Sequence, residues 1–367
     1  MRSRNIHLVV PNLAPYDAVG NDVAQMRIAL MESGHVVRVF SEAIDPACAS
    51  IADPIDRVPR DLWKSSDTIL IYHHSIGWPR GEEILFNTDN KVILRYHNIT
   101  PAHFFAPFSL PFTEACETGI ESTKRIVKLP NLLFVGASSY NCQDLISYGA
   151  NPDACSVLPP FHLTEELGRE MFDIETVSRY AGATVNILFV GGVKPNKGHA
   201  HAISAFAEYH RNYNDRSRLI FAGNMDERLG KYLDSLKSLA RHLRVAEHII
   251  FTGRLTNAQI KSLYVSADIF LCASEHEGFC VPLVESMYFR VPVVAWGNTA
   301  VPETMGDYSA VIQKWDEFAF AAQIDRIVED AEIAEHLGTT GRRRYQEAFS
   351  PSVLRKQLDG IIDETVS

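Results

Sequence analysis

The stretch "VGGVKPNKGHAHAISAF", residues 190–206, joins an apolar run to a helical pattern through a glycine-bearing loop. A buried strand, such a loop and a helix in this order are typical of one unit of a doubly wound α/β fold. Glycines allow backbone N–H groups to approach a phosphate, and a helix N-terminus favours negative charge. Lys197 would add a cation at the helix start. The stretch therefore predicts either a phosphate site or an ordinary turn with a solvated lysine.

The same alternation runs through all 367 residues. Short runs of β-branched, aliphatic or aromatic residues fit strands that are buried on both faces of a parallel sheet. We expect strands at residues 6–10, 35–40, 68–74, 91–97 and 131–138, and at 186–192, 218–223, 248–253, 268–274 and 291–297. The pattern predicts two doubly wound, Rossmann-like α/β domains facing a central cleft, where ligands bind at the carboxyl ends of the strands.

Helical patterns and prolines set the expected boundaries. Residues 21–34, 198–213 and 230–243 place apolar side chains at helical spacing. Pro159 and Pro160 cannot continue a central strand, so the first domain should end there. We expect an N-terminal domain over 1–160, a linker over 161–183, a C-terminal domain over 184–345, and a final helix within 346–367 that packs back on the N-terminal domain.

Composition excludes several classes of protein. Hydrophobic residues make up 46% and charged residues 22%, which is ordinary for a soluble globular chain. The formal net charge of −10 argues against a nucleic-acid binder, because phosphate binding needs a basic face. The sequence contains no uninterrupted apolar window of eighteen residues, so no membrane-spanning helix is expected. Six cysteines without a C-x-x-C pair disfavour a zinc knuckle and suit reduced thiols in a cytoplasm.

A second stretch with candidate chemistry is "SEHEGFCVPLVESMYF", residues 274–289. It follows an expected strand and so reaches the same sheet edge as the loop before Gly198. Glu285 lies in the first turn of a helix that Pro282 would begin, where a carboxylate gains about 0.3–1 kcal/mol from the helix dipole. That gain could explain Glu285 without a ligand. Glu277 precedes a glycine at the strand tip, where binding residues concentrate.

Several common sites are absent from the sequence. The glycines match neither a Walker loop nor G-x-G-x-x-G, which disfavours a dinucleotide dehydrogenase. No two aspartates stand two positions apart, so the metal-binding D-x-D of many sugar transferases is missing, and no metal or cofactor is expected. His73 and His74 point to opposite faces of one strand and are poorly placed to share a metal.

Two features of the first half stay open. His97, at the tip of the strand at 91–97, is either a core histidine or a residue of the cleft. The run "HFFAPFSLPF", residues 103–112, is either a packed loop or a patch that meets an acceptor or a membrane.

These blocks together resemble glycosyltransferase family 4, whose members have the GT-B fold. "EGFCVPLVE" resembles the E-x7-E motif of that family, and "VGGVKPNKG" is similar to its V-G-R-x-x-P-x-K-G loop. "FTGRLTNAQIKSLYVSADIFL" and "VPVVAWGNTAVPETMGD" resemble further blocks in order and spacing. The resemblance covers most of residues 186–307, and the first half resembles the family more loosely, through Gly20 and the histidine of "RYHN".

The resemblance implies a role for each matching residue. Glu285 would bind the ribose hydroxyls of a nucleotide, Glu277 would bind the donor sugar, and Lys197 would neutralise the diphosphate leaving group. His97 would orient the sugar and the attacking hydroxyl, and Gly20 would let a loop close on the phosphate. His97, Lys197 and Glu277 are the implied catalytic residues. The other implied donor-binding positions are Gly191, Gly192, Arg254, Leu255, Gly278, Phe279, Cys280 and Val281.

One position departs from the pattern of the family. The family usually carries an arginine where this chain has Gly192, so one of two cations that would face the diphosphate is missing. Lys194, two positions later, is the candidate substitute.

The resemblance implies a retaining, metal-independent hexosyltransferase that uses GDP-mannose or a UDP-hexose. The C-terminal domain would bind the nucleotide sugar, and the N-terminal domain would lie on the acceptor side. The implied acceptor is a saccharide or lipid-linked saccharide of a bacterial surface polysaccharide. That places the protein in the cytoplasm, with peripheral contact at the inner membrane face. Two alternatives stay open, a sugar-nucleotide epimerase of the same architecture and a non-catalytic protein that binds nucleotide sugars.

Overall fold

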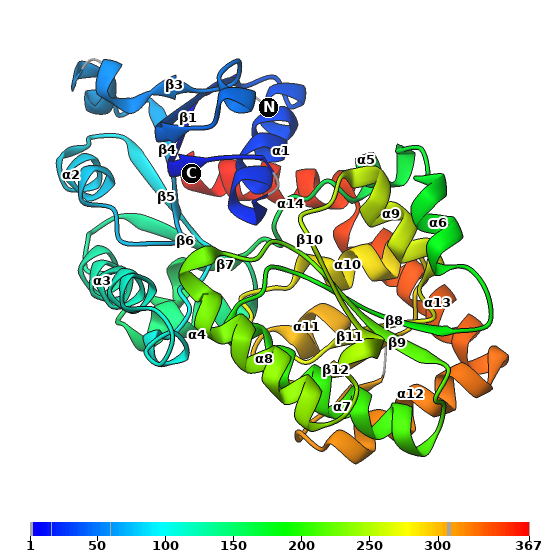
Figure 1. Cartoon of the computed structure of the whole chain (residues 1–367). Coiled ribbons are helices and arrows are strands. Elements are labelled where there is room, and N and C mark those ends of the chain that lie inside the picture. Colours follow the sequence, from blue (N-terminus) through cyan, green and yellow to red (C-terminus); the bar gives the residue numbers. More distant parts are fainter. Residues whose placement is uncertain (1–2, 16, 59, 307–309, 367) are drawn as a thin grey trace. The chain divides into compact units, whose positions relative to one another are not determined.

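The computed structural model describes residues 3–15, 17–58, 60–306 and 310–366, which form two compact units (Figure 1). The first unit comprises Met1–Ala102, Pro111–Leu163 and Phe349–Ser367, and the second comprises His103–Leu110 and Thr164–Ala348. Each unit is built around one parallel β-sheet with helices in its connections.

The first unit contains a seven-stranded sheet in the order β3-β2-β1-β4-β5-β6-β7. Its strands are β1 (Asn5–Leu13), β2 (Val36–Ile44), β3 (Asp53–Pro54), β4 (Thr68–His74), β5 (Lys91–Tyr96), β6 (Leu132–Gly136) and β7 (Cys155–Val157). Every side chain of β4 is buried, as expected for a central strand that is covered on both faces. The strand order reverses between β1 and β4, and ligands bind at such switch points in open α/β sheets.

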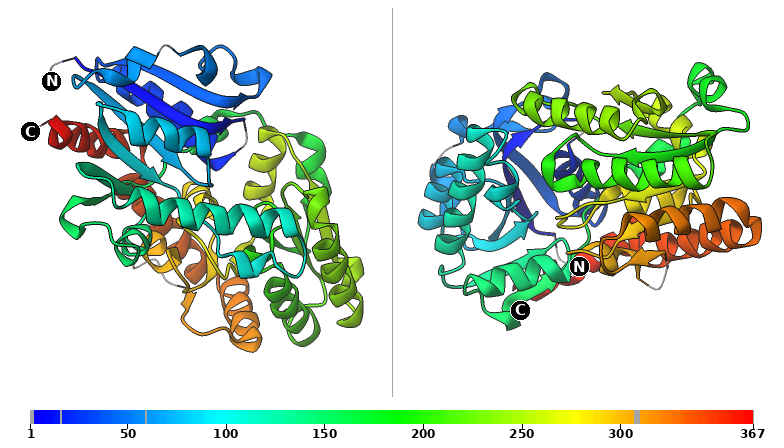
Figure 2. Two further views of the ribbon diagram at one scale, coloured as in Figure 1. Left: turned by 90° about the vertical axis from the view of Figure 1, so that its left-hand side faces the viewer. Right: turned by 60° about the horizontal axis from the view of Figure 1, so that its bottom comes forward.

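The longer helices of the first unit are α1 (Ala18–Glu32), α2 (Pro79–Asn87), α3 (Leu110–Ile126), α4 (Ser139–Ser147) and α14 (Pro351–Val366). The C-terminal helix α14 contacts α1 and β5. Its Leu354, Leu358 and Ile362 are buried in one apolar cluster with β1. Figure 2 shows this red helix against the blue N-terminal elements. The last segment of the chain therefore completes the core of the first unit.

The second unit contains a six-stranded sheet in the order β10-β9-β8-β11-β12-β13, with its switch point between β8 and β11. Its strands are β8 (Val185–Val190), β9 (Ser217–Ala222), β10 (Ile249–Gly253), β11 (Ile269–Cys272), β12 (Val293–Trp296) and β13 (Val311–Ile312). Its α-helices are α5 (Thr164–Arg169), α6 (Ile174–Tyr180), α7 (His199–Asn212), α8 (Gly230–His242), α9 (Asn257–Ser266), α10 (Val281–Tyr288), α11 (Val301–Met305), α12 (Glu317–Glu329) and α13 (Ala331–Arg344).

The fold class expected from the sequence, two Rossmann-like α/β domains, is confirmed, and each of the ten expected strands overlaps an observed one. The short strands β3, β7 and β13 were not expected. They have two or three residues each and lie at sheet edges, so none of them produces an apolar run. Residues 161–183, expected to be a linker, contain α5 and α6, and the compact units divide at Leu163.

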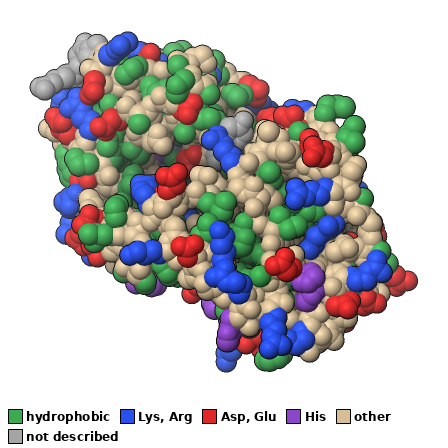
Figure 3. Space-filling view, in the orientation of Figure 1, with side chains coloured by type: hydrophobic (Ala, Val, Ile, Leu, Met, Phe, Trp, Pro, Cys, Tyr) green, Lys and Arg blue, Asp and Glu red, His purple; other side chains and the backbone are tan. Residues whose placement is uncertain are grey.

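Two observations bear on the environment of the chain. Within the described residues, each helix is too short or too polar to cross a lipid bilayer. On the face shown in Figure 3, acidic and basic side chains are interspersed. That face therefore offers no broad basic surface of the kind that binds a phosphate backbone.

Candidate functional site

Two loops meet at the carboxyl edge of the second sheet, beside its switch point. They are the β8 loop, residues 191–198, and the β11 loop, residues 273–280. Gly198 has a φ of +70°, and a Cβ there would lie 1.8 Å from the carbonyl oxygen of Ala273, so only glycine permits this approach. The carbonyl of Asn196 accepts hydrogen bonds from the amides of Glu275 (2.9 Å) and His276 (3.1 Å). The two loops are therefore held together by backbone contacts.

Lys197 and Glu277 form an ion pair between these loops. The Nζ atom of Lys197 lies 2.7 Å from each carboxylate oxygen of Glu277. The Lys197 side chain is 25% exposed and that of Glu277 is 7% exposed. Ser274 Oγ donates to Glu277 Oε1 at 2.9 Å, and the Glu277 amide donates to Thr299 Oγ1 at 2.9 Å. The carboxylate is therefore fixed in both position and orientation.

The charge of Lys197 is also fixed by its surroundings. Burial, the largest single effect, would lower the pKa of Lys197, but the charge and hydrogen bond of Glu277 together with the nearby Cys280 and Cys272 outweigh it, so the pKa is raised. Lys197 therefore carries a full positive charge at neutral pH, at the switch point of the sheet.

Glu285 lies in α10, which follows the β11 loop. Tyr264 donates a hydrogen bond to Glu285 Oε2 at 2.6 Å. Burial raises the pKa of Glu285, and the hydrogen bond from Tyr264 opposes that rise. Glu285 is thus a carboxylate that lacks full solvation and gains from any further hydrogen-bond donor.

The turn into α10 carries four of the implied backbone positions. Gly278, Phe279 and Cys280 form the end of the β11 loop, and Val281 is the first residue of the helix. Cys280 has a φ of +77°, and no side chain caps the N-terminus of α10. The helix start therefore presents the positive end of its dipole at this edge of the sheet. All six cysteines of the chain are free thiols.

The remaining implied positions of the second unit lie in neighbouring loops. Gly191 and Gly192 belong to the β8 loop, while Arg254, which is exposed, and Leu255 lie between β10 and α9. At Gly192, a Cβ would meet only Asn224 O at 3.6 Å and Lys194 Cε at 3.8 Å. A side chain therefore fits at Gly192, and Lys194 already borders the space that it would fill.

Lys194 is exposed, and its charge also acts on Asp226. The pKa of Asp226 is lowered chiefly by its hydrogen bond from Arg228, and Lys194 contributes a smaller part. Part of the positive charge of Lys194 is therefore offset by Asp226. Lys194 is for that reason a weaker substitute for the arginine of the family than a cation without a nearby carboxylate would be.

The phenylalanine-rich run packs as a loop on the second unit. Phe104 lies 6.1 Å from the ring of His276, and Phe108 lies 5.0 Å from the ring of Tyr232. Phe105 is buried, whereas Leu110 is 67% exposed. Of the two alternatives that the sequence left open, the structure favours the packed loop, which borders the β11 loop through His276.

Gly20 and His97 belong to the first unit. Gly20 lies in the first turn of α1, where a Cβ would lie 2.3 Å from the carbonyl oxygen of Ala14. Its amide donates to the Asp17 side chain at 3.1 Å. Gly20 is thus required for the close approach of α1 to the end of β1. His97 follows β5 and keeps a side-chain exposure of 8%.

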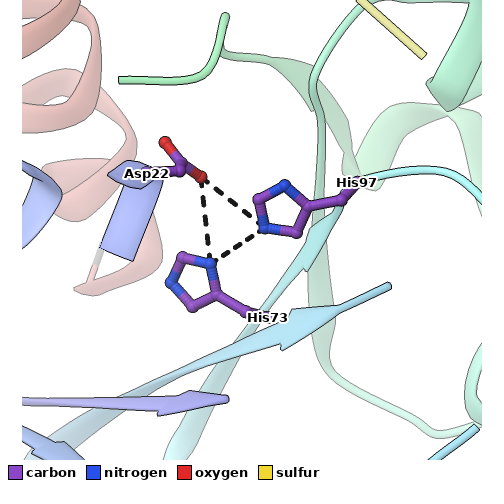
Figure 4. Close-up of side chains that lie close together, drawn as sticks. All are labelled: Asp22, His73 and His97. Carbon is purple, nitrogen blue, oxygen red and sulfur yellow. Dashed lines mark hydrogen bonds and ion pairs between the residues drawn. The ribbon is translucent and has the colours of Figure 1, made fainter. Parts of the chain in front are cut away.

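His97 is one member of a buried polar cluster at the carboxyl edge of the first sheet (Figure 4). Its Nε2 atom lies 2.9 Å from His73 Nδ1 and 3.6 Å from Asp22 Oδ2. Arg95 Nε donates to Asp22 Oδ2 at 2.9 Å, and the Phe161 amide donates to Asp22 Oδ1 at 2.7 Å. Asp22, His73 and Arg95 are fully buried. His97 is therefore placed by a buried network that leaves its side chain 8% exposed.

Both histidines of this cluster are neutral. Burial, followed by the charge of Arg95, holds the pKa of His97 well below its usual range. Burial and His97 do the same for His73, and the nearby Asp22 carboxylate offsets only part of that effect. The neighbouring His74 points to the other face of β4, where its Nε2 lies 2.8 Å from Thr123 Oγ1, as expected from strand geometry.

Asp22, His73 and His97 also form the group of possible metal ligands in the described part of the chain, with ligand atoms within 4.8 Å of one another. Two observations disfavour a metal there. Arg95 already supplies the positive charge that Asp22 needs. His73 Nε2 has no hydrogen-bond partner, whereas a ligating histidine normally donates its other ring N–H.

Asp22 and Arg95 were not predicted from the sequence to be partners of His97. A signal was available, because each is a charged residue within a pattern of buried apolar positions, and such a residue needs a partner. Ser274, Thr299 and Tyr264 were also missed, because a hydroxyl that positions a carboxylate leaves no distinctive spacing in the sequence.

Comparison with known proteins extends these observations. Residues 179–344 match the family described as "Glycosyl transferases group 1". A segment of the chain is 24% identical over 258 residues to MMP alpha-(1->4)-mannosyltransferase of Mycolicibacterium hassiacum, covering 68% of this chain and 57% of that protein. For two further curated relatives the covered share of the relative is 40% and 36%, so the chain spans about half the length of the curated relatives that it matches.

Solved structures are similar over nearly the whole chain. Sucrose-phosphate synthase from Thermosynechococcus elongatus has a TM-score of 0.76 at 16% identity, covering 98% of each chain. Anabaena HepE in complex with UDP and glucose has a TM-score of 0.73 at 15% identity, covering 98% of this chain and 100% of the other. At such identities the likeness establishes the fold. The chain therefore has the GT-B fold of these structures, and its residues 179–344 are similar to the group 1 glycosyl transferases.

Proposed function

We propose that the protein transfers a hexosyl unit from a nucleoside-diphosphate sugar to a saccharide or lipid-linked saccharide, with retention of the anomeric configuration. The observation that carries this proposal is the ion pair between Lys197 and Glu277, which lies at the switch point of the second sheet. A fixed cation and a fixed carboxylate side by side suit a ligand that carries both phosphate and hydroxyl groups.

The pair gives each part of the donor a distinct partner. The ammonium of Lys197 would bind the diphosphate, and the Glu277 carboxylate would accept hydrogen bonds from the sugar hydroxyls. Glu285, which has one donor in Tyr264, would accept further hydrogen bonds from the ribose. Because Glu277 and Glu285 flank the start of α10, the positive end of that helix would face the phosphates between the two sugars.

The chemistry requires stabilisation of negative charge on the leaving diphosphate. Lys197 and the dipole of α10 are held in place before the reaction and supply that stabilisation without reorganisation. The transferred sugar becomes positively charged as its bond to the phosphate breaks. Because the Glu277 carboxylate is engaged by Lys197 and Ser274, we assign it to sugar binding and not to covalent catalysis. Retention would then follow from attack on the same face, with the leaving phosphate accepting the proton of the acceptor hydroxyl.

Our proposal for the donor and acceptor classes rests on the chemistry of the site and on the names of similar proteins. The relatives include mannosyltransferases, and one similar structure holds UDP and glucose, so GDP-mannose and UDP-hexoses are the donors of choice for a first screen. We propose no metal requirement, because the charge of Lys197 is available at the diphosphate. A lipid-linked acceptor of bacterial surface polysaccharide biosynthesis would place the protein in the cytoplasm, at the inner face of the membrane.

The test is incubation of the full chain with GDP-mannose and UDP-hexoses, with and without saccharide acceptors, followed by NMR of the products. Acceptor-dependent transfer with the donor's anomeric configuration is the expected result. Free altered nucleotide sugar without an acceptor would show an epimerase instead. Binding without any turnover across the panel would show a non-catalytic binding protein. Lys237→Ala, which removes an exposed lysine of α8, is the matched control for variants of Lys197.

A further inference from the structure

A direct hydrogen bond joins the rings of two neutral histidines in the first unit, His73 Nδ1 and His97 Nε2, at 2.9 Å. A neutral imidazole carries one N–H, so one of these nitrogens must donate and the other accept. The bond therefore couples the two tautomers. If His73 donates from Nδ1, the proton of His97 is on Nδ1, and if His97 donates from Nε2, the proton of His73 is on Nε2.

The second nitrogen of His73 distinguishes these two states. His73 Nε2 is buried without a hydrogen-bond partner. A proton on that atom would be an orphaned buried N–H group, which is the rarest kind of unsatisfied group in folded proteins. A proton on His73 Nδ1 avoids this orphaned donor, because it is used in the bond to His97 and lies 3.8 Å from the Asp22 carboxylate. The structure therefore favours the state in which His73 donates.

The consequence for His97 is a proton on Nδ1. That nitrogen points away from both His73 and Asp22 in Figure 4, and it has no hydrogen bond among the described residues. The His97 side chain keeps 8% exposure. His97 then presents an N–H donor at the surface of the cluster, suited to an oxygen acceptor such as a sugar hydroxyl.

We propose that His73 is a positioning residue that fixes His97 as an Nδ1–H donor to a substrate oxygen. The part about substrate rests on the proposed function. Asp22 lies 3.8 Å from His73 Nδ1 and 3.6 Å from His97 Nε2, so it faces both bonded nitrogens without selecting between the two states, and it is itself held by Arg95 and the Phe161 amide. The charged groups that face the histidine pair are the Asp22 carboxylate and the Arg95 guanidinium, with His74 adjacent, and burial is the main reason that both rings stay neutral.

The test uses the full chain labelled with ¹⁵N-histidine. Long-range ¹H–¹⁵N NMR of the unliganded protein distinguishes the two tautomers, because a protonated and an unprotonated ring nitrogen have well-separated shifts. The expected result is a protonated Nδ1 and an unprotonated Nε2 on both His97 and His73. A proton on His97 Nε2 would overturn the proposal, and so would a stoichiometric metal ion found by elemental analysis.

Variants separate this inference from the proposed function. His73→Phe removes the donor to His97, and we expect the fixed tautomer to give way to an exchanging mixture. Transfer activity should fall by about tenfold, the equivalent of one hydrogen bond of ~1.4 kcal/mol. His74→Phe is the matched control, because it makes the same substitution at the adjacent buried histidine, which points to the other face of β4, and it should leave the His97 shifts unchanged. If His73→Phe does not fold, the shifts of the unaltered protein decide alone.

The outcomes remain distinguishable. A protonated His97 Nδ1 with unchanged activity in a folded His73→Phe variant would support the tautomer assignment and contradict the role of His97 in transfer. A protonated Nε2 would contradict the tautomer assignment whatever the activity.

Discussion

At the scale of single residues, the ammonium of Lys197 and the carboxylate of Glu277 each serve as the ionic partner of the other. A buried ion pair is weak evidence of stabilisation, since the cost of removing both charges from water offsets their attraction. At this position ligand binding explains the pair better, because the ammonium can bind a phosphate and the carboxylate can accept hydrogen bonds from hydroxyl groups. Single-residue changes at Lys197, Glu285 and Gly192 test that explanation.

Replacement of Lys197 by alanine should reduce turnover by about 10²–10³-fold, the usual effect of removing one preorganised charge-stabilising group. Donor affinity should change much less, because the charge on the leaving diphosphate grows in the transition state. Steady-state kinetics combined with calorimetry of donor binding measures both effects. Lys237→Ala should leave both quantities unchanged. Equal and small effects of Lys197→Ala on turnover and affinity would contradict the assigned role.

The pH dependence of nucleotide binding should report on Glu285. Its pKa in the folded chain is raised by burial, so the contribution of this group to stability is present at low pH and is lost as the pH rises through the raised pKa. Ribose hydroxyls donate to the ionised carboxylate, so the affinity should fall as the pH falls through that raised pKa, above the usual carboxyl range.

Calorimetry of nucleoside-diphosphate binding between pH 5 and neutrality measures this dependence. Glu285→Gln, which keeps an acceptor for Tyr264, should weaken binding at neutral pH and flatten the pH profile. Tyr264→Phe removes the hydrogen bond that holds the pKa down and should move the profile to higher pH. A profile that is the same in all three proteins would reduce Glu285 to a structural residue.

Gly192→Arg should strengthen diphosphate binding. A side chain fits there, since its Cβ would make only ordinary contacts at 3.6 Å and 3.8 Å. The gain should be up to roughly fivefold in affinity, in line with the ~1 kcal/mol upper range of an exposed ion pair. The uncharged Gly192→Gln is the control, and the gain should be larger in a Lys194→Ala background. An arginine that gives no gain in either background would show that no diphosphate lies beside this loop.

At the scale of elements, the site depends on how closely the β8 loop approaches the β11 loop. The approach is set by Gly198, whose position combines a left-handed backbone with contact to the Ala273 carbonyl. The hydrogen bonds of Asn196 to residues 275 and 276 then fix the register of the two loops. The Lys197–Glu277 distance is a consequence of this packing of backbone on backbone.

Gly198→Ala should therefore destabilise the protein by about 2–4 kcal/mol, the sum of left-handed strain and overpacking. Chemical denaturation measures the loss in the free energy of unfolding. Gly360→Ala is the matched control, because Gly360 lies inside α14 with no heavy atom within 4 Å of the added methyl group. That control should stabilise the protein by about 0.5–1 kcal/mol. Equal effects of the two substitutions would mean that the loops do not need this approach.

At the scale of the whole molecule, the chain returns to its first unit after completing the second. Helix α14 buries Leu354, Leu358, Ile361 and Ile362 in the core that β1 and α1 form. The core of the first unit thus contains residues that are distant in the sequence, and the folding of that unit depends on helix α14.

Leu358→Ala should destabilise the first unit by about 2–5 kcal/mol, the usual cost of a buried leucine-to-alanine change. Leu358 is 2% exposed, whereas its neighbour Lys356 is exposed, so Lys356→Ala is the control. Calorimetry with limited proteolysis should locate the loss in residues 1–102 and 111–163. A loss confined to residues 164–348 would contradict this assignment of α14.

The prediction of the fold from sequence succeeded where a strand is buried on both faces, because such strands are continuous apolar runs. It missed the edge strands β3, β7 and β13, which are only two or three residues long. At the site, the spacing of Lys197, Glu277 and Glu285 was visible because loops after parallel strands share one edge of a sheet. The partners Asp22, Arg95, Ser274 and Tyr264 were not identified, because they act through contacts between distant segments.

The two α/β domains and the candidate residues could be inferred from the sequence alone, since both follow from local periodicity and from the order of strands and loops. Only the tertiary structure decided that Lys197 neutralises Glu277, that Tyr264 supports Glu285 and that His73 is bonded to His97. These contacts join residues separated by 80, 21 and 24 positions. Their distances, and the protonation states that follow, depend on side-chain packing and burial, which local sequence patterns do not encode.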